Sequence, residues 1–308
     1  MIFQEKLKSK EKIFLDGGNG SEIARLGGDM SPAFAALATI NSPDIVVKVH
    51  ENFINAGCDI ITANTFATNR HNLDSLNYSD KTDKFILKSV ELAKKALSNT
   101  GMDNKIGIAN AEYSFITEPH SSGVFTSLTD GSQVINFIRE NSTALDFPKN
   151  KLILAGVSAG AGIALWNGFR EETNSEVKGI VGLYAQSTYD INKWEAIFPD
   201  LNLDSIKEVN SEIRDLYTQF YGGEYTAEKA MDLDFLSEID ADDPTLYLYN
   251  PVYKDEVISE GILDLDVLFH SFKHADLLRK KTTEVGLECS GAYQELPQEF
   301  IERILIDQ

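Results

Sequence analysis

Ser158 lies in the middle of the segment Gly156–Gly160, whose residues are Gly-Val-Ser-Ala-Gly. The apolar run 152–155 precedes this segment and the small, apolar run 161–166 follows it, which predicts a strand, a tight turn and a helix. A turn of this kind exposes the serine hydroxyl, and its glycines let the strand and the helix approach closely. The pattern indicates a serine nucleophile with the Ala159 amide holding the oxyanion, and the structural alternative is a plain turn of small residues.

A serine nucleophile needs a neighbouring base and an acid that orients this base. The late histidines of the chain are His270 and His274, and we predict His274 as the base, with His270 as the alternative. Asp255 comes after the predicted strand 245–249, where the orienting acid is expected. A helix-capping or surface position for each histidine, and a surface loop for Asp255, are the structural alternatives.

The same two histidines are four residues apart, so they share one face if both are helical, and such a pair can also bind a metal. No third ligand accompanies them at a motif spacing. Cys58 and Cys289 are far apart in the sequence and predict neither a disulfide framework nor a metal-binding pair. We therefore predict no metal and no cofactor.

Short apolar runs alternate with helical patterns along the chain, which predicts an α/β fold. The acidic stretch 191–239 is predicted as a helical insertion that covers the site, and Tyr189, Trp194 and Phe198 at its entrance are expected to shape an acyl pocket or to pack in the core. The predicted strands are 13–15, 58–65, 106–111, 152–155, 179–184 and 245–249, and the predicted helices are 42–56, 85–97, 134–145, 274–285 and 299–306.

The segment from about residue 104 to residue 300 resembles esterases and lipases of the α/β-hydrolase fold, on the residues Ala111–Ser114, Leu128–Gly131, Phe137–Asn141 and Gly156–Gly162. The resemblance implies a three-layer α/β-hydrolase-like domain that hydrolyses small carboxylic esters through an acyl-enzyme at Ser158. This family usually supplies further oxyanion amides from a His-Gly-Gly-Gly loop, which the segment lacks.

The segment from about residue 11 to residue 97 resembles instead the start of homocysteine S-methyltransferases, which are TIM barrels, on the residues Leu15–Glu22 and Ala56–Phe66. Gly17 and Gly18 lie in its glycine-rich turn, and their amides are candidates to replace the missing loop if this segment packs on or into the hydrolase sheet. The methyltransferase family binds zinc through a late cysteine pair and one more cysteine, whereas this chain has Cys289 alone in that region. Zinc-dependent methyl transfer is therefore not expected.

The composition restricts the partners of the protein. A net charge of −20 over 308 residues argues against nucleic acid and against an anionic membrane surface. No apolar stretch approaches the roughly 18 residues of a membrane span, and the first residues do not form a signal peptide, so a cytoplasmic location is expected.

We therefore predict two parts, a methyltransferase-like βα segment over residues 1–103 and a hydrolase-like domain over residues 104–308. The predicted function is serine-dependent hydrolysis of a small-molecule ester, with the oligomeric state left open. The rival functions are ligand binding by a non-catalytic hydrolase fold and, less favoured, a role related to homocysteine S-methyltransferases.

Overall fold

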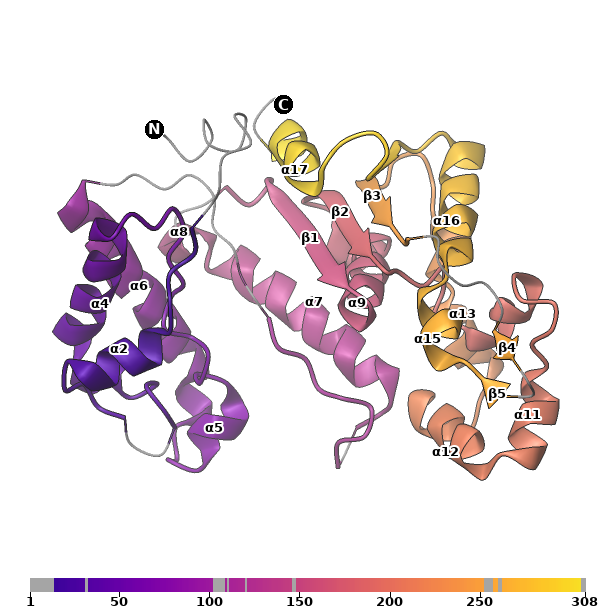
Figure 1. The fold of residues 1–308 in the computed structure, drawn as a ribbon, viewed down its shortest axis with the longest axis horizontal. Coiled ribbons are helices and arrows are strands. Elements are labelled where there is room, and N and C mark those ends of the chain that lie inside the picture. Colours follow the sequence, from indigo (N-terminus) through magenta and orange to yellow (C-terminus); the bar gives the residue numbers. More distant parts are fainter. Residues whose placement is uncertain are drawn as a thin grey trace. The chain divides into compact units, whose positions relative to one another are not determined.

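The structure of the protein is a computed structural model (Figure 1). The chain divides into two compact units, Met1–Ala109 with Asn141–Phe147 and Asn110–Glu140 with Pro148–Gln308, which we call the first and the second unit. The domain boundary that we predict after residue 103 lies outside the described residues. The described residues are 14–30, 33–101, 109, 111–119, 121–145, 148–251, 257–259 and 262–305.

The first unit is mainly helical. Its two longest helices, α4 (Pro43–Asn55) and α6 (Thr82–Thr100), pack against each other and bury Val46 and Leu92 in a shared core. Helix α4 begins as predicted, with Pro43 at its first position. The other helical elements within the described residues of this unit are α2 (Asn19–Arg25), α3 (Ala38–Asn41), α5 (Arg70–Asp74), η1 (Ser79–Lys81) and α8 (Ser142–Leu145).

Extended chain in the first unit is reduced to one isolated parallel bridge between Leu15 and Ile60, within the described residues. The Asp16 carboxylate reinforces it, because it accepts hydrogen bonds from the Thr62 amide at 2.8 Å and from the Thr62 hydroxyl at 2.9 Å. The predicted strands 13–15 and 58–65 therefore meet side by side but form only this bridge. The predicted strand 106–111 lies mostly outside the described residues.

The second unit is built on a four-stranded parallel sheet with the strand order β1–β2–β3–β6. The first three strands coincide with apolar runs that the sequence marks as strands, and β6 is additional to the prediction. A separate antiparallel pair is formed by β4 (Ile258–Ser259) and β5 (Ile262–Leu263). The strands of the main sheet are β1 (Leu152–Val157), β2 (Val177–Leu183), β3 (Thr245–Tyr249) and β6 (Cys289–Gly291).

Helices cover both faces of this sheet (Figure 1). Helix α9 (Ala159–Gly168) packs on β1 and β2, and α16 (Phe272–Val285) contacts β3 and β6. Helix α17 (Pro297–Leu305) packs Phe300 against Val181 of β2. The preceding strand residue, Ile180, faces the larger core on the opposite side of the sheet. The fold class is α/β, as predicted.

Helix α7 (Val124–Glu140) packs on α9 and starts at Val124, whereas the predicted helix starts at residue 134. Glycine usually weakens a helix interior, yet Gly131 lies inside α7. The structure gives the reason for its position, because a Cβ on Gly131 would lie 2.6 Å from Ile163 of α9. The close crossing of the two helices requires this glycine.

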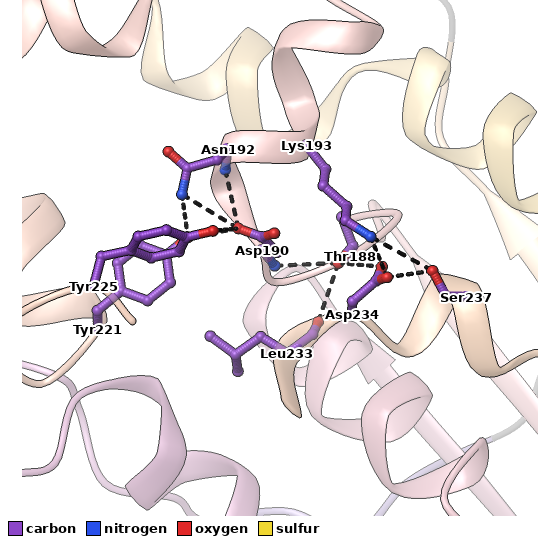
Figure 2. Close-up of polar contacts among 9 residues, drawn as sticks. All are labelled: Thr188, Asp190, Asn192, Lys193, Tyr221, Tyr225, Leu233, Asp234 and Ser237. Carbon is purple, nitrogen blue, oxygen red and sulfur yellow. Dashed lines mark hydrogen bonds and ion pairs between the residues drawn. The ribbon is translucent and has the colours of Figure 1, made fainter. Parts of the chain in front are cut away.

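Helical elements fill the chain between β2 and β3, where the sequence predicts a helical insertion. Asp190, which is buried, lies at its start and accepts hydrogen bonds from the hydroxyls of Tyr221 at 3.2 Å and Tyr225 at 3.4 Å (Figure 2). Burial raises the pKa of Tyr221 and keeps this phenol neutral. The elements of the insertion are η2 (Ile191–Ala196), α11 (Leu203–Val209), α12 (Ser211–Phe220), α13 (Ala227–Leu233) and α14 (Phe235–Glu238). The short helix α10 (Glu171–Asn174) lies before β2 and is not part of it.

A second polar cluster ties the start of the insertion to its end. The buried Asp234 carboxylate pairs with Lys193 of η2 and accepts a hydrogen bond from Ser237 of α14 (Figure 2). Thr188 donates to the Leu233 carbonyl at 3.1 Å. These contacts therefore join the first element of the insertion to its last.

Candidate active site

Ser158 lies at the turn between β1 and α9 and has φ 56° and ψ −120°, a backbone conformation that residues other than glycine rarely adopt. The turn is tight because a Cβ on Gly156 would lie 2.1 Å from the backbone of Gly160. Gly160 itself has open space at the position of a Cβ, so the steric requirement falls on Gly156. The predicted strand, turn and helix are present, with the serine at the turn.

A hydrogen-bonded chain leads away from the serine hydroxyl. Ser158 Oγ lies 2.7 Å from His270 Nε2, and His270 Nδ1 lies 2.7 Å from Asp266 Oδ1. If Nδ1 carries the proton that Asp266 accepts, Nε2 is free to accept the serine proton. Ser158, His270 and Asp266 thus have the connectivity of a nucleophile, a base and an orienting acid.

Helix α15 (Leu265–His270) supplies both His270 and Asp266, which are four residues apart and therefore on one face. Asp264 caps the start of the helix, because its side chain accepts a hydrogen bond from the Val267 amide at 3.1 Å. Asp266 is not among the residues that the sequence analysis singles out. The spacing of an aspartate four residues before His270 is the signal that could have identified it, while Asp255 lies outside the described residues.

Asn250, which follows β3 and is buried, positions the end of α15. Its amide nitrogen donates to the carbonyls of His270 at 3.2 Å and Ser271 at 3.0 Å, and also to the Ala185 carbonyl at 2.9 Å. Its side-chain oxygen accepts from the Ala185 amide at 2.9 Å. Asn250 therefore links His270 and Ser271 to Ala185, which follows β2, at the carboxyl ends of β2 and β3.

His274 does not have the surroundings of a base for Ser158, and here the prediction is corrected. Its Nδ1 accepts hydrogen bonds from the Ser187 amide at 3.2 Å and hydroxyl at 3.0 Å, and its Nε2 donates to the Leu268 carbonyl at 2.8 Å. The residue is fully buried, and this burial lowers its pKa to about 4. Both ring nitrogens are engaged in the interior, because Ser271 separates α15 from α16 and turns the two histidines apart.

The Ala159 amide is a candidate donor to an oxyanion. Ala159 is the first residue of α9, so its amide has no partner within the helix. The Ala159 carbonyl accepts a hydrogen bond from Tyr189 at 2.8 Å, which fixes this peptide group. Gly17 and Gly18 belong to the first unit, and their contribution to an oxyanion site stays a prediction.

A cavity of about 240 Å³ opens beside Ser158 and Ala159. Its walls are mainly apolar side chains from α9, α12 and α15, among them Ile163, Leu216 and Leu268. Of the three aromatic residues predicted to shape an acyl pocket, Tyr189 lines the cavity. Trp194 and Phe198 instead pack their rings against His274, with centroids 4.9 Å and 5.5 Å from its ring.

The described parts of the chain hold no group of three or more His, Cys, Asp or Glu residues suited to a metal ion. Cys58 and Cys289 are free thiols. Among the helices of these same parts, none is both long and apolar enough to cross a bilayer.

Comparison with known proteins finds a family model that covers most of the second unit and a part of the first. The model of the family described as BD-FAE matches residues 88–259, which is more than half of the 308 residues. The chain belongs to the BD-FAE family. The BD-FAE match includes the Ser158 turn but ends before α15, so it does not reach His270.

A second family model, described as homocysteine S-methyltransferase, matches residues 13–148 and overlaps the BD-FAE match. The chain is 33% identical over 86 residues to the selenocysteine Se-methyltransferase of Brassica oleracea var. italica, and 28% identical over 102 residues to homocysteine S-methyltransferase 2 of Arabidopsis thaliana. These matches cover 27% and 30% of this chain, but only 25% and 31% of the relatives. The chain thus spans a minor part of the methyltransferases that it matches.

Solved structures similar to this BD-FAE family member include an acetyl ester-xyloside bifunctional hydrolase from Caldicellulosiruptor lactoaceticus, at 13% identity and a TM-score of 0.36 over 54% of each chain. Another is an esterase from Thermogutta terrifontis, at 12% identity and a TM-score of 0.34 over 55% of this chain and 54% of that one. A likeness at this level is too weak to support a conclusion about function.

Proposed function

We propose that the protein is a serine esterase in which Ser158 attacks the acyl carbon of a small carboxylic ester. His270 takes the proton of Ser158 Oγ and then gives it to the leaving alcohol, and Asp266 holds the imidazole and stabilises its protonated form. The Ala159 amide stabilises the oxyanion. A water activated by His270 then releases the acid from the acyl-enzyme.

The observation that carries this proposal is the continuous hydrogen-bonded chain from Ser158 through His270 to Asp266, with 2.7 Å at each step, beside an apolar cavity. The strained Ser158 backbone supports it, because such conformations persist mainly where function needs them. Membership of the BD-FAE family and the α/β sheet agree with a hydrolase-type, esterase-like protein.

Hydrolysis of short p-nitrophenyl esters tests the proposal. We expect turnover by the wild type, loss of turnover in Ser158→Ala, and a decrease of about 10²- to 10⁴-fold in His270→Ala, because the base is removed. Ser205→Ala, which changes an exposed serine of α11, is the matched control and should keep full activity. Equal rates for the wild type and Ser158→Ala would refute the proposal.

A second candidate function is ligand binding without turnover. The observation that favours it is the exposure of Asp266, whose side chain is 67% accessible. Water solvates this carboxylate and therefore weakens its interaction with the His270 imidazole. Binding of an ester that persists unchanged in the wild type would support this alternative.

The methyltransferase-like segment supports no separate activity for the chain. The match to those relatives covers about a quarter of their length, and Cys58 and Cys289 belong to different units. The packing of this segment on or into the hydrolase sheet stays a prediction.

A further inference from the structure

Helix α12 presents one face to the cavity beside Ser158. The residues of this helix that line the cavity are Ile213, Leu216, Tyr217 and Phe220. Their spacing of three and four residues places them on one side of the helix. The other residues of α12 are exposed to solvent. The helix is therefore amphipathic, and its mainly apolar face forms one wall of the cavity.

The wall that α12 forms extends over two helical turns. Phe220 packs its ring against Tyr189, with 5.8 Å between the ring centroids, and the Tyr189 hydroxyl donates to the Ala159 carbonyl at 2.8 Å. Ile213 lies two turns before Phe220, which corresponds to about 10 Å along the helix. The cavity therefore follows α12 from Phe220, which Tyr189 joins to Ala159, as far as Ile213.

Buried phenol groups hold this wall in place. Tyr221, directly after α12, donates to the buried Asp190 carboxylate at 3.2 Å (Figure 2) and accepts from the Ile191 amide at 2.9 Å. The Tyr217 hydroxyl accepts from the Asn192 side chain at 2.9 Å and donates to it at 3.1 Å. A wall that is fixed in this way limits the length of a group that can enter the cavity.

The composition and volume of the cavity define the kind of group that it accepts. None of the described residues that line it is charged, and most are apolar, among them Ile116, Ile163 and Leu268. A charged group would lose its hydration there without gaining a partner of opposite charge in these walls. An apolar cavity of about 150 Å³ accommodates one benzene molecule, so the volume of about 240 Å³ corresponds to about eight to ten carbon atoms.

We infer that the natural substrate is the ester of an uncharged, unbranched aliphatic acid of about six to ten carbons, and that Leu216 limits the length of this chain. The inference rests on the proposed function, because it takes Ser158 as the nucleophile. Ser158 and Ala159 line the cavity, and the acyl group stays bonded to Ser158 after the alcohol has left. Leu216 lies between Phe220 and Ile213 on the α12 wall, so its side chain meets the middle of the chain.

Two series of esters test the inference. The p-nitrophenyl esters of acetic, butyric, octanoic and dodecanoic acid vary the acyl chain, and ethyl, butyl and octyl acetate vary the alcohol. We expect kcat/KM for the octanoate to exceed that for the acetate by about tenfold or more, because each buried methylene favours binding. The dodecanoate, kept below the concentration at which it aggregates, should react more slowly than the octanoate. The alcohol series should change kcat/KM by less than about threefold.

Variants of α12 test the role of Leu216. Leu216→Trp fills part of the cavity and should lower the ratio of octanoate to acetate hydrolysis by about tenfold or more. Leu216→Ala enlarges the cavity and should raise the ratio of dodecanoate to octanoate severalfold, and it carries the test if the tryptophan variant does not fold. Asp215→Trp and Asp215→Ala change an exposed neighbour on the same helix and should keep the wild-type ratios.

The failures of the two proposals are distinguishable. Hydrolysis that depends on Ser158 but is fastest with the acetate, or that follows the length of the alcohol instead, would overturn the inference and leave the esterase proposal intact. Wild-type ratios in folded Leu216→Trp and Leu216→Ala would overturn the role of Leu216. No hydrolysis of any ester above the rate of Ser158→Ala would reject the esterase proposal, and the inference with it.

Discussion

His270 and His274 are four residues apart and have opposite surroundings. The imidazole of His270 is partly exposed and bridges Ser158 and Asp266, whereas His274 is enclosed by Trp194 and Phe198. Proton transfer requires a ring that can gain and lose a proton beside the reacting group, which fits the first histidine. The second is fixed as a neutral ring that accepts from Ser187 and donates to the Leu268 carbonyl.

The neutral state of His274 predicts how stability depends on pH. Its pKa in the folded protein is about 4, below the ordinary value of 6.5, so the unfolded chain binds a proton that the folded protein excludes. The free energy of unfolding should therefore fall as the pH decreases from about 6.5 to about 4, by at most about 1.4 kcal/mol per pH unit from this residue.

Urea unfolding at a series of pH values measures this slope. His274→Gln should flatten it, because glutamine does not titrate, while His270→Gln leaves His274 in place and should retain it. Equal slopes in His274→Gln and the wild type would contradict the assignment.

The two aspartates proposed for the acid role are separable by mutation. We expect Asp266→Asn to lower kcat by about tenfold to hundredfold, since the imidazole loses its partner, but less than for a fully buried acid because Asp266 is exposed. Asp255→Asn should change kcat little. Steady-state kinetics on one p-nitrophenyl ester makes the comparison, and the reverse ranking would assign the acid role to Asp255.

Two structural elements meet at the Ser158 turn, and their distance is set by Gly156. We expect Gly156→Ala to destabilise the protein by more than about 2 kcal/mol, because its Cβ would lie 2.1 Å from backbone atoms of Gly160. Gly160→Ala is the matched control and should be tolerated, since nothing lies within 4 Å of its Cβ position. Chemical denaturation measures both, and equal losses would contradict this account of the turn.

Helix α15 depends on Asn250 for its position. Replacing Asn250 by alanine should leave the buried carbonyls of His270, Ser271 and Ala185 short of a donor and lower the free energy of unfolding by about 1–3 kcal/mol. The activity should fall as well, because the base is held by the same contacts. Denaturation and ester turnover of Asn250→Ala check the two effects, and a variant with unchanged stability would exclude this anchoring role.

The elements differ in how far the sequence predicts them. The three apolar strands and the Ser158 turn follow from local patterns, because β1, β2 and β3 are short apolar runs bounded by turns. The length of α7 does not, since the packing of Gly131 against α9 is a tertiary contact. The sequence could not choose between His270 and His274 for the same kind of reason: the break at Ser271 between α15 and α16 decides which histidine contacts Ser158.

At the scale of the whole molecule, each unit has hydrophobic cores of its own. The core of the first unit includes Val46 and Leu92, and the main core of the second unit includes Leu128 and Leu165. Each compact unit that buries its own apolar side chains can unfold as a cooperative transition. The methyltransferase match at 13–148 includes most of the first unit, and the BD-FAE match at 88–259 includes most of the second, with an overlap at the boundary between them.

Calorimetry of core variants tests this independence. We expect Leu128→Ala to lower the melting temperature of one transition, with a loss of about 2–5 kcal/mol, and Val46→Ala to lower that of another. Ester turnover after heating should follow the transition that Leu128→Ala shifts, because Ser158 lies in the same unit. A single transition shifted by both variants would show that the units unfold together.

The most direct test of the central claim is covalent labelling of Ser158 by a fluorophosphonate, followed by mass spectrometry of the peptides. The account predicts one adduct, on the peptide that contains Ser158, formed rapidly in the wild type and at least about a hundredfold more slowly in His270→Ala. Labelling at the same rate in His270→Ala, or no adduct on Ser158 in folded wild-type protein, would contradict a serine nucleophile activated by His270.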